Sequence, residues 1–159
     1  MLKTKIKEHL LEKAKADLSA ALEANESASD YKGSDDLKQE GKYDTRAIEA
    51  GYLAGAQAKR VEELKLEVQM IEELPVRDFE SGEAAAVGAL VKLLHNEIER
   101  LYFLSSTAGG SMLNIDGSPV LVISVFSPIG AGAVNLEAGE SFELETPSGS
   151  RIYEVLEVF

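Results

Sequence analysis

Hydrophobic residues in the first part of the chain recur with a helical period. Between Leu2 and about Glu26 apolar residues occupy every fourth position, and Lys and Glu fill the opposite face. The apolar positions are Leu2, Ile6, Leu10, Ala14, Leu18 and Leu22. This pattern predicts an amphipathic helix with one face available for packing.

A polar stretch then separates this helix from a second one. Residues 24–36 (ANESASDYKGSDD) are rich in Ser, Asp and Gly, which favour a turn. From Tyr43 apolar positions recur in alternating steps of four and three, as in a coiled-coil seam, until Pro75 ends the helix. Two such helices joined by one polar loop predict an antiparallel hairpin over residues 1–76, with its tip near 30–42.

After a linker at 77–83 the period changes to short β runs separated by turn residues. The runs are AAAVGALVKLL, ERLYFLSS, PVLVISVF, SFELE and RIYEVLEVF. The last two predict a hairpin that turns at Pro147 and Gly149, and Leu121, Ile123 and Val125 alternate as buried strand positions. Ser127 is placed to cap a short helix with Pro128 at its first position. The fold class is therefore α+β, with the helical hairpin followed by an antiparallel β domain over 84–159.

Composition and charge narrow the function classes. The chain has 159 residues and no Cys, which excludes disulfides and thiolate metal sites. Its net charge is −12, and both parts contribute equally: residues 1–83 carry 13 basic and 19 acidic groups and residues 84–159 carry 3 and 9, so each sums to −6. This balance argues against sequence-specific DNA binding. With no signal peptide and no membrane-length apolar run, we expect a cytoplasmic protein without a membrane partner.

Four motifs in the C-terminal half resemble a known family. Ser127-Pro128-Ile129-Gly130, Gly139-Glu140, Thr146-Pro147-Ser148-Gly149 and Tyr153-Glu154-Val155-Leu156 occur in this order. Together they are similar to the C-terminal domain of the GreA/GreB transcript-cleavage factors. The resemblance implies an FK506-binding-protein-like (FKBP-like) fold that docks on RNA polymerase at the rim of its secondary channel. It also implies that Ser127, Pro128, Ile129 and Gly130 bind this partner.

The N-terminal half resembles a divergent branch of the same family. Its segment DLKQEGKY (36–43) is similar to the acidic hairpin tip of GreA and GreB, with Asp36 at the first acidic position. The second acidic position falls on Gln39, and a shift of one residue places Glu40 there. In a helix, Asp36 and Glu40 would lie on one side, spaced to share an ion, with Asp35 nearby.

The resemblance implies an accessory elongation factor rather than an enzyme. The tip carboxylates of Asp36 and Glu40, with Asp35 in reserve, would support a Mg²⁺ ion that is shared with RNA polymerase and not bound stably by the factor itself. The polymerase would then cleave backtracked RNA, so the factor would meet the nascent RNA 3′ end only indirectly. A second metal held by hard carboxylate ligands suits the hydrolysis of a phosphodiester.

Other interpretations stay open at this point. Acidic residues before a helix also stabilise its N-terminus, which explains Asp35 and Asp36 without any metal. A neutral Gln39 fits a secondary-channel regulator that does not support cleavage. The C-terminal resemblance admits a peptidyl-prolyl isomerase or chaperone, and the helical seam admits a coiled-coil adaptor.

Overall fold

The computed structural model describes the backbone of residues 2–32 and 45–159, and the side chains of residues 2–26 and 55–159. The chain divides into two compact units. One consists of Met1–Leu10 with Met70–Phe159, and the other of Leu11–Gln69. Within the described ranges, no helix combines the length and apolar character needed to cross a membrane. The hairpin at 1–76, linker at 77–83 and domain at 84–159 stay a prediction.

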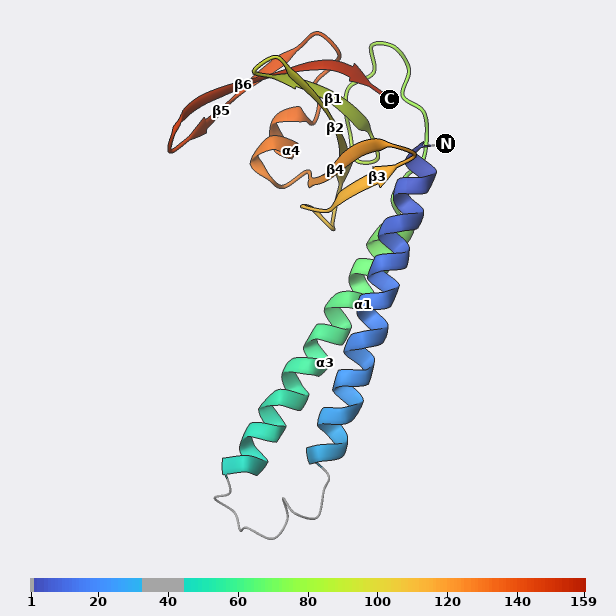
Figure 1. The fold of residues 1–159 in the computed structure, drawn as a ribbon, viewed down its shortest axis with the longest axis vertical. Coiled ribbons are helices and arrows are strands. Elements are labelled where there is room, and N and C mark those ends of the chain that lie inside the picture. The colour runs from blue at the N-terminus through green and yellow to red at the C-terminus, as the bar shows by residue number, and fades with distance from the viewer. Residues whose placement is uncertain (1, 33–44) are drawn as a thin grey trace. The chain divides into compact units, whose positions relative to one another are not determined.

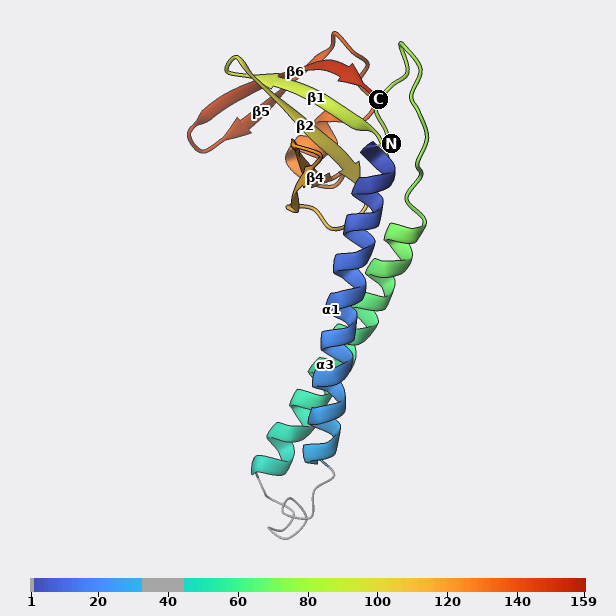
Figure 2. The ribbon, with the colours of Figure 1, turned by 45° about the vertical axis from the view of Figure 1, so that its right-hand side comes forward.

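Two long helices form the N-terminal region, α1 (Leu2–Lys32) and α3 (Thr45–Glu72). They lie side by side and run antiparallel (Figures 1 and 2). Ala21, Val61 and Leu64 are buried together in the second unit, and Leu18 packs against them. Val61 and Leu64 belong to the predicted seam of α3, so the helical pair is confirmed.

The seam of α1 departs from the predicted period of four. Ile6, Leu10 and Ala14 are buried, whereas Leu22 is 44% exposed and Ala21 takes its place. An α-helix turns about 100° per residue, so each step of four advances the side chain by about 40°. Between Ile6 and Leu22 the accumulated rotation is about 160°, which carries Leu22 away from the partner helix. A step of three is needed to return to the buried face.

Helix α1 is also longer than predicted. The turn expected from Ala24 onward is helical as far as Lys32. Residues 2–32 contain neither Gly nor Pro. The Ser, Asn and Asp residues in this stretch cost a helix only about 0.7 kcal/mol each or less, which is too little to end a helix that already has many turns.

Helix α3 ends at Glu72, three residues before Pro75, as a proline stop requires. The Leu74 amide donates to the Ile71 carbonyl at 3.1 Å. The Lys7 ammonium donates to the carbonyls of Glu72 at 2.7 Å and Leu74 at 2.8 Å. Carbonyls at a helix C-terminus have no partner within the helix, and this lysine supplies one.

The C-terminal region is built around one sheet of six strands in the order β3-β4-β2-β1-β6-β5. The strands are β1 (Leu90–His95), β2 (Ile98–Ser105), β3 (Met112–Ile115), β4 (Ser118–Ser124), β5 (Ser141–Thr146) and β6 (Gly149–Val158). The predicted hairpin is confirmed, since β5 and β6 pair from Ser141↔Glu154 to Thr146↔Gly149. With the short helix α4 (Pro128–Ala133), the sheet confirms the α+β class.

One neighbouring pair of strands is parallel, which the antiparallel prediction did not include. β2 pairs with β4 in parallel, from Leu101↔Val120 to Ser105↔Ser124. The cause is β3, a four-residue edge strand that the sequence pattern did not reveal. β3 is antiparallel to β4, so it returns the chain along the sheet edge and lets β4 begin at the same end as β2.

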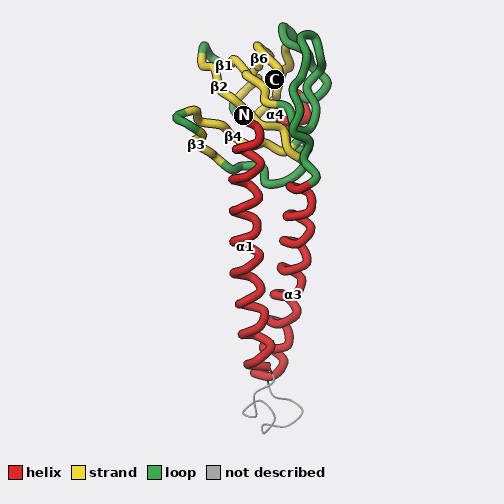
Figure 3. The backbone as a smooth tube through the Cα atoms, turned by 90° about the vertical axis from the view of Figure 1, so that its right-hand side faces the viewer, coloured by secondary structure: helices red, strands yellow, loops and turns green. Residues whose placement is uncertain are grey.

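The run AAAVGALVKLL is a strand only from Leu90 onward. Residues 73–89 form turns and loops, drawn green in Figure 3. Gly88 has φ +91, and a Cβ atom at this position would lie 2.6 Å from the Pro75 carbonyl oxygen. This conformation and close approach favour glycine, and they interrupt the extended backbone that six apolar residues had suggested.

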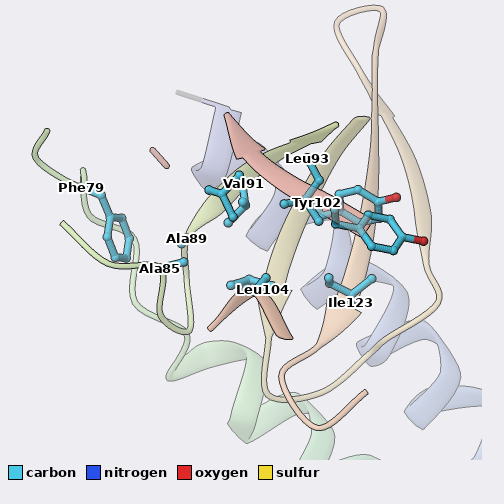
Figure 4. Packing of buried hydrophobic residues seen from close by; sticks show 11 residues of the cluster. Phe79, Ala85, Ala89, Val91, Leu93, Tyr102, Leu104 and Ile123 are labelled. Atoms are coloured by element: carbon cyan, nitrogen blue, oxygen red, sulfur yellow. The ribbon is translucent and has the colours of Figure 1, made fainter. Parts of the chain in front are cut away.

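The core of the sheet lies on the face that carries α4. Val91, Leu93, Tyr102, Leu104 and Ile123 extend from three neighbouring strands into one cluster (Figure 4). Leu121, Ile123 and Val125 share this face as predicted, with Ile123 in the cluster and the other two packed against it. Val120 and Val122 are fully buried on the other face, while Leu121 and Val125 are only partly buried. β4 lies between two other strands and has both faces covered, and strands of this kind lose the in-out alternation of a half-exposed strand.

Candidate functional site

The loop that joins β4 to α4 contains the residues predicted to bind a partner. Ser127 has extended backbone angles (φ −75, ψ 158), as an N-cap requires. Its hydroxyl accepts a hydrogen bond from the Gly130 amide at 3.2 Å and donates one to the Ser124 carbonyl at 2.6 Å. The predicted cap, with Pro128 at the first helical position, is confirmed.

Gly130 permits a close approach between α4 and the end of β4. A Cβ atom at Gly130 would lie 1.9 Å from the Ser124 carbonyl oxygen and 2.8 Å from the carbonyl carbon. No side chain fits this space unless the backbone moves. The Ser124 carbonyl also accepts a hydrogen bond from the Ser127 amide at 3.0 Å. This carbonyl therefore holds the N-cap residue of α4 against the end of β4.

Phe126 projects from this loop and is 81% exposed. Its amide donates to the Ser124 hydroxyl at 3.1 Å, so its backbone belongs to the same network. Sequence reasoning did not select Phe126 as a site residue. A hydrophobic residue just before an N-cap usually packs against the fourth helical residue. That position here is Ala131, which is small and exposed. The lack of a large packing partner at this position was the sequence signal that could have identified Phe126 as exposed.

The four predicted partner-binding residues differ in their surroundings. Pro128 is exposed next to Phe126 in the sequence, whereas Ile129 is half-buried and packs against the core of the sheet. Ser127 and Gly130 shape the backbone, as described above. The surface that this loop offers to another molecule is therefore formed by Phe126 and Pro128, on a base held by the other three.

The loop differs in charge from the rest of the protein. Residues 124–130 (SVFSPIG) contain no ionisable side chain, in a chain whose net charge is −12. Large exposed aromatic residues with few neighbouring charges are typical of the centre of protein interfaces. The loop therefore has the chemistry of a protein-binding surface.

Comparison with known proteins identifies the family. No family model matches the sequence. Over 123 residues the chain is 31% identical to transcription elongation factor GreA of Neorickettsia sennetsu, which covers 77% of this chain and 72% of that protein. The chain belongs to the GreA/GreB family. It is thus a transcription elongation factor of the GreA type, as the four C-terminal motifs had indicated.

Solved structures of this family match the chain at low identity. GreA factor homolog 1 (Gfh1) of Thermus thermophilus is 20% identical, covers 94% of both chains and has a TM-score of 0.38. Gfh1 of Thermus aquaticus is 19% identical over 92% of both chains, with a TM-score of 0.40. A GreA/GreB factor from Nitrosomonas europaea is 19% identical, covers 62% of this chain and 78% of its own, and has a TM-score of 0.34.

The GreA-like tip residues lie outside the described residues. Asp35, Asp36, Gln39 and Glu40 all fall within residues 33–44. Among the side chains of residues 2–26 and 55–159, no group of three His, Asp or Glu residues is placed to hold a metal ion. Whether Asp36 and Glu40 support Mg²⁺ therefore stays a prediction from the family resemblance.

Proposed function

We propose that this GreA-family factor binds RNA polymerase in its secondary channel and stimulates the polymerase to cleave backtracked RNA. The factor is an accessory protein in this proposal, and the polymerase catalyses the hydrolysis. The observation that carries the proposal is the hydrogen-bonded, uncharged loop presenting Phe126, in a chain whose family acts on transcription elongation. The nascent RNA 3′ end is then an indirect partner.

The docking half of the proposal assigns Phe126 and Pro128 as the contact residues. The hydroxyl of Ser127 and the absence of a side chain at Gly130 hold the loop against β4. A preformed loop loses little conformational entropy on binding, so more of the contact energy appears as affinity.

The cleavage half assigns the tip carboxylates. Asp36 and Glu40 offer hard oxygen ligands that suit Mg²⁺, and Asp35 adds negative charge nearby. When bound, the ion would orient an attacking water and neutralise charge on the phosphate. The helices α1 and α3 are 31 and 28 residues long, or about 45 Å each at 1.5 Å per residue, and they carry this segment between them.

Binding to purified RNA polymerase tests the docking half. We expect Phe126→Ala to weaken binding by about 30-fold, the effect of losing one central aromatic contact of about 2 kcal/mol. Ile152→Ala is the control, because Ile152 is also a large exposed hydrophobic residue of the sheet region, 64% exposed. Equal affinities for the two variants would rule out the loop as the contact.

Cleavage of stalled, backtracked complexes in Mg²⁺ tests the other half. We expect Asp36→Ala combined with Glu40→Ala to slow RNA trimming by about tenfold or more while polymerase binding is retained. Glu8→Ala combined with Glu12→Ala removes the same charge at the same spacing, from exposed positions of α1. If the tip variant trims RNA as fast as wild type, the tip carboxylates have no role.

Gln39 supports a second candidate function on the same partner. An amide brings no charge to a divalent ion, so a tip with Gln39 at the second acidic position would hold Mg²⁺ more weakly. The factor would then occupy the channel and regulate synthesis without supporting cleavage. Competition with a cleavage-competent GreA, without RNA trimming by this chain, distinguishes the two functions. Restored trimming in Gln39→Glu would favour the regulator.

A further inference from the structure

A pocket of about 490 Å³ lies on the sheet, between the ends of the β1–β2 and β5–β6 hairpins. Its lining includes His95, Arg100, Tyr102, Ser150, Arg151 and Tyr153, and it contains no Asp or Glu. The volume falls within the range of pockets that hold small ligands. The polymerase-docking loop does not contribute to this lining, so the pocket needs an explanation of its own.

Strand register places the arginines and the acidic residues on opposite faces of the sheet. Leu93 pairs with Arg100 on one side and with Val155 on the other. Arg151 shares the face of Val155, because residues four apart on a strand point the same way. The glutamates of these strands point to the opposite face of the sheet, because each is an odd number of residues away from a pocket-facing position. They are Glu99, Glu143, Glu145 and Glu154.

This arrangement concentrates positive charge in an acidic protein. Residues 84–159 carry only three basic side chains, Lys92, Arg100 and Arg151, and two of them line the pocket. Lys92 lies on the other face and pairs with Glu157 at 3.6 Å. In the part of the chain whose side chains are described, no carboxylate is within ion-pair distance of Arg100 or Arg151. Both guanidinium groups are available to an external anion.

Aromatic groups complete the pocket. The rings of His95 and Tyr153 are stacked with centroids 4.5 Å apart, and the His95 Nδ1 donates to the Ile152 carbonyl at 3.0 Å. Burial raises the pKa of Tyr102, so its hydroxyl keeps its proton at neutral pH, beside the Arg100 side chain. A neutral phenol adds no negative charge that would oppose an anion.

The two arginines reach the pocket from separate backbone positions. Arg100 and Arg151 lie two strands apart and four residues apart in register, which corresponds to about 10 Å across the sheet and about 13 Å along it. A ligand with anionic groups at both ends engages both side chains better than a single small anion does. Each guanidinium group presents five N–H donors, which suit the several oxygens of a phosphate.

We propose that this pocket binds a small anion that carries at least two linked phosphate groups. Arg100 and Arg151 each bind one end, and the hydroxyl of Tyr102 supplies a further hydrogen bond. Nothing in this assignment depends on RNA polymerase, so the isolated factor has the activity by itself.

Calorimetric titration of the 159-residue chain with inorganic pyrophosphate tests the proposal. The salt concentration is about 150 mM, so that weak surface attraction is screened. We expect saturable binding at least tenfold tighter than that of orthophosphate or of succinate, a dicarboxylate of similar length. Arg100→Gln and Arg151→Gln should each weaken pyrophosphate binding at least tenfold. Lys92→Gln, which removes the same charge from the other face, should leave it unchanged. Thermal unfolding of each variant verifies that it is folded.

Three results would overturn the assignment. The first is no pyrophosphate binding by the wild-type protein. The second is equal weakening by Lys92→Gln and Arg100→Gln, which indicates attraction by net charge alone. The third is affinity for orthophosphate or succinate equal to that for pyrophosphate, which excludes a site built for two phosphate groups.

Discussion

Replacement of Gly130 by alanine tests whether the loop between β4 and α4 is held by close backbone packing. The added methyl group would lie 1.9 Å from the Ser124 carbonyl oxygen, a distance that no carbon-oxygen contact tolerates. Because the obstacle is backbone and not the end of a flexible side chain, relief requires that α4 move away from β4. We expect a loss of stability from both the strain and the bonds that this movement breaks.

The magnitude follows from the contacts of that carbonyl. Overpacking of a well-packed site costs about 1–3 kcal/mol. The Ser124 carbonyl also accepts the Ser127 hydroxyl at 2.6 Å and the Ser127 amide at 3.0 Å, and weakening both adds about 1 kcal/mol. We therefore expect Gly130→Ala to destabilise the sheet region by about 3 kcal/mol. For a chain of this size that lowers Tm by roughly 6–12 °C.

Chemical denaturation followed by circular dichroism measures this loss, and Gly55→Ala is the control. Gly55 lies within α3, and a Cβ atom there would have nothing within 4 Å. In a helix interior the same substitution should stabilise by about 0.5–1 kcal/mol. Opposite signs for the two variants are the expected result. A Gly130→Ala protein within 0.5 kcal/mol of wild type would refute the inference that backbone contact holds the loop.

Two further predictions concern the helices and the pH dependence of stability. Leu64 is 2% exposed in the helical seam, so Leu64→Ala should lower the free energy of unfolding by about 2–5 kcal/mol. Leu66 is 57% exposed, so Leu66→Ala should lower it by less than about 0.5 kcal/mol. Equal losses for the two variants would mean that the helices do not pack along this face. The Lys5 ammonium donates to the Asp116 carboxylate and lowers its pKa. A carboxyl whose folded pKa is lowered adds stability above its unfolded pKa, about 3.9, and loses it as pH falls through the folded value. The stability gap between wild type and Asp116→Asn should therefore be full at pH 6 and shrink below about pH 4, and a gap that is constant with pH would exclude this ion pair.

Local patterns predicted those elements whose signals lie close together in the sequence. Ser127 followed by Pro128 predicted a capped helix, and the structure has that cap with its hydrogen bonds. The hairpin β5–β6 was evident from alternation on both sides of Pro147 and Gly149. In both cases the residues that determine the geometry are within a few positions of one another, so short-range chemistry is sufficient.

Other features depended on neighbours that are distant in the sequence. In the seam of α1, Ala21 is buried and Leu22 is exposed because the helix rotates relative to α3, whose contacting residues lie some 40 positions further along the chain. The parallel pair β2–β4 depends on the short edge strand β3, whose four residues alone have no strong strand signal. Phe126 is of a residue type that is usually buried, and only the packing around α4 leaves it exposed.

The primary structure thus determined the α+β class and the family, because periodicity, turn chemistry and motif order are properties of neighbouring residues. Folding alone decided that Arg100 and Arg151, 51 positions apart, line one pocket while the strand acids face away from it. The register of each strand against the next sets which side chains share a face, and a shift of one residue would exchange the two faces. Such a register is a property of the assembled sheet, to which all six strands contribute.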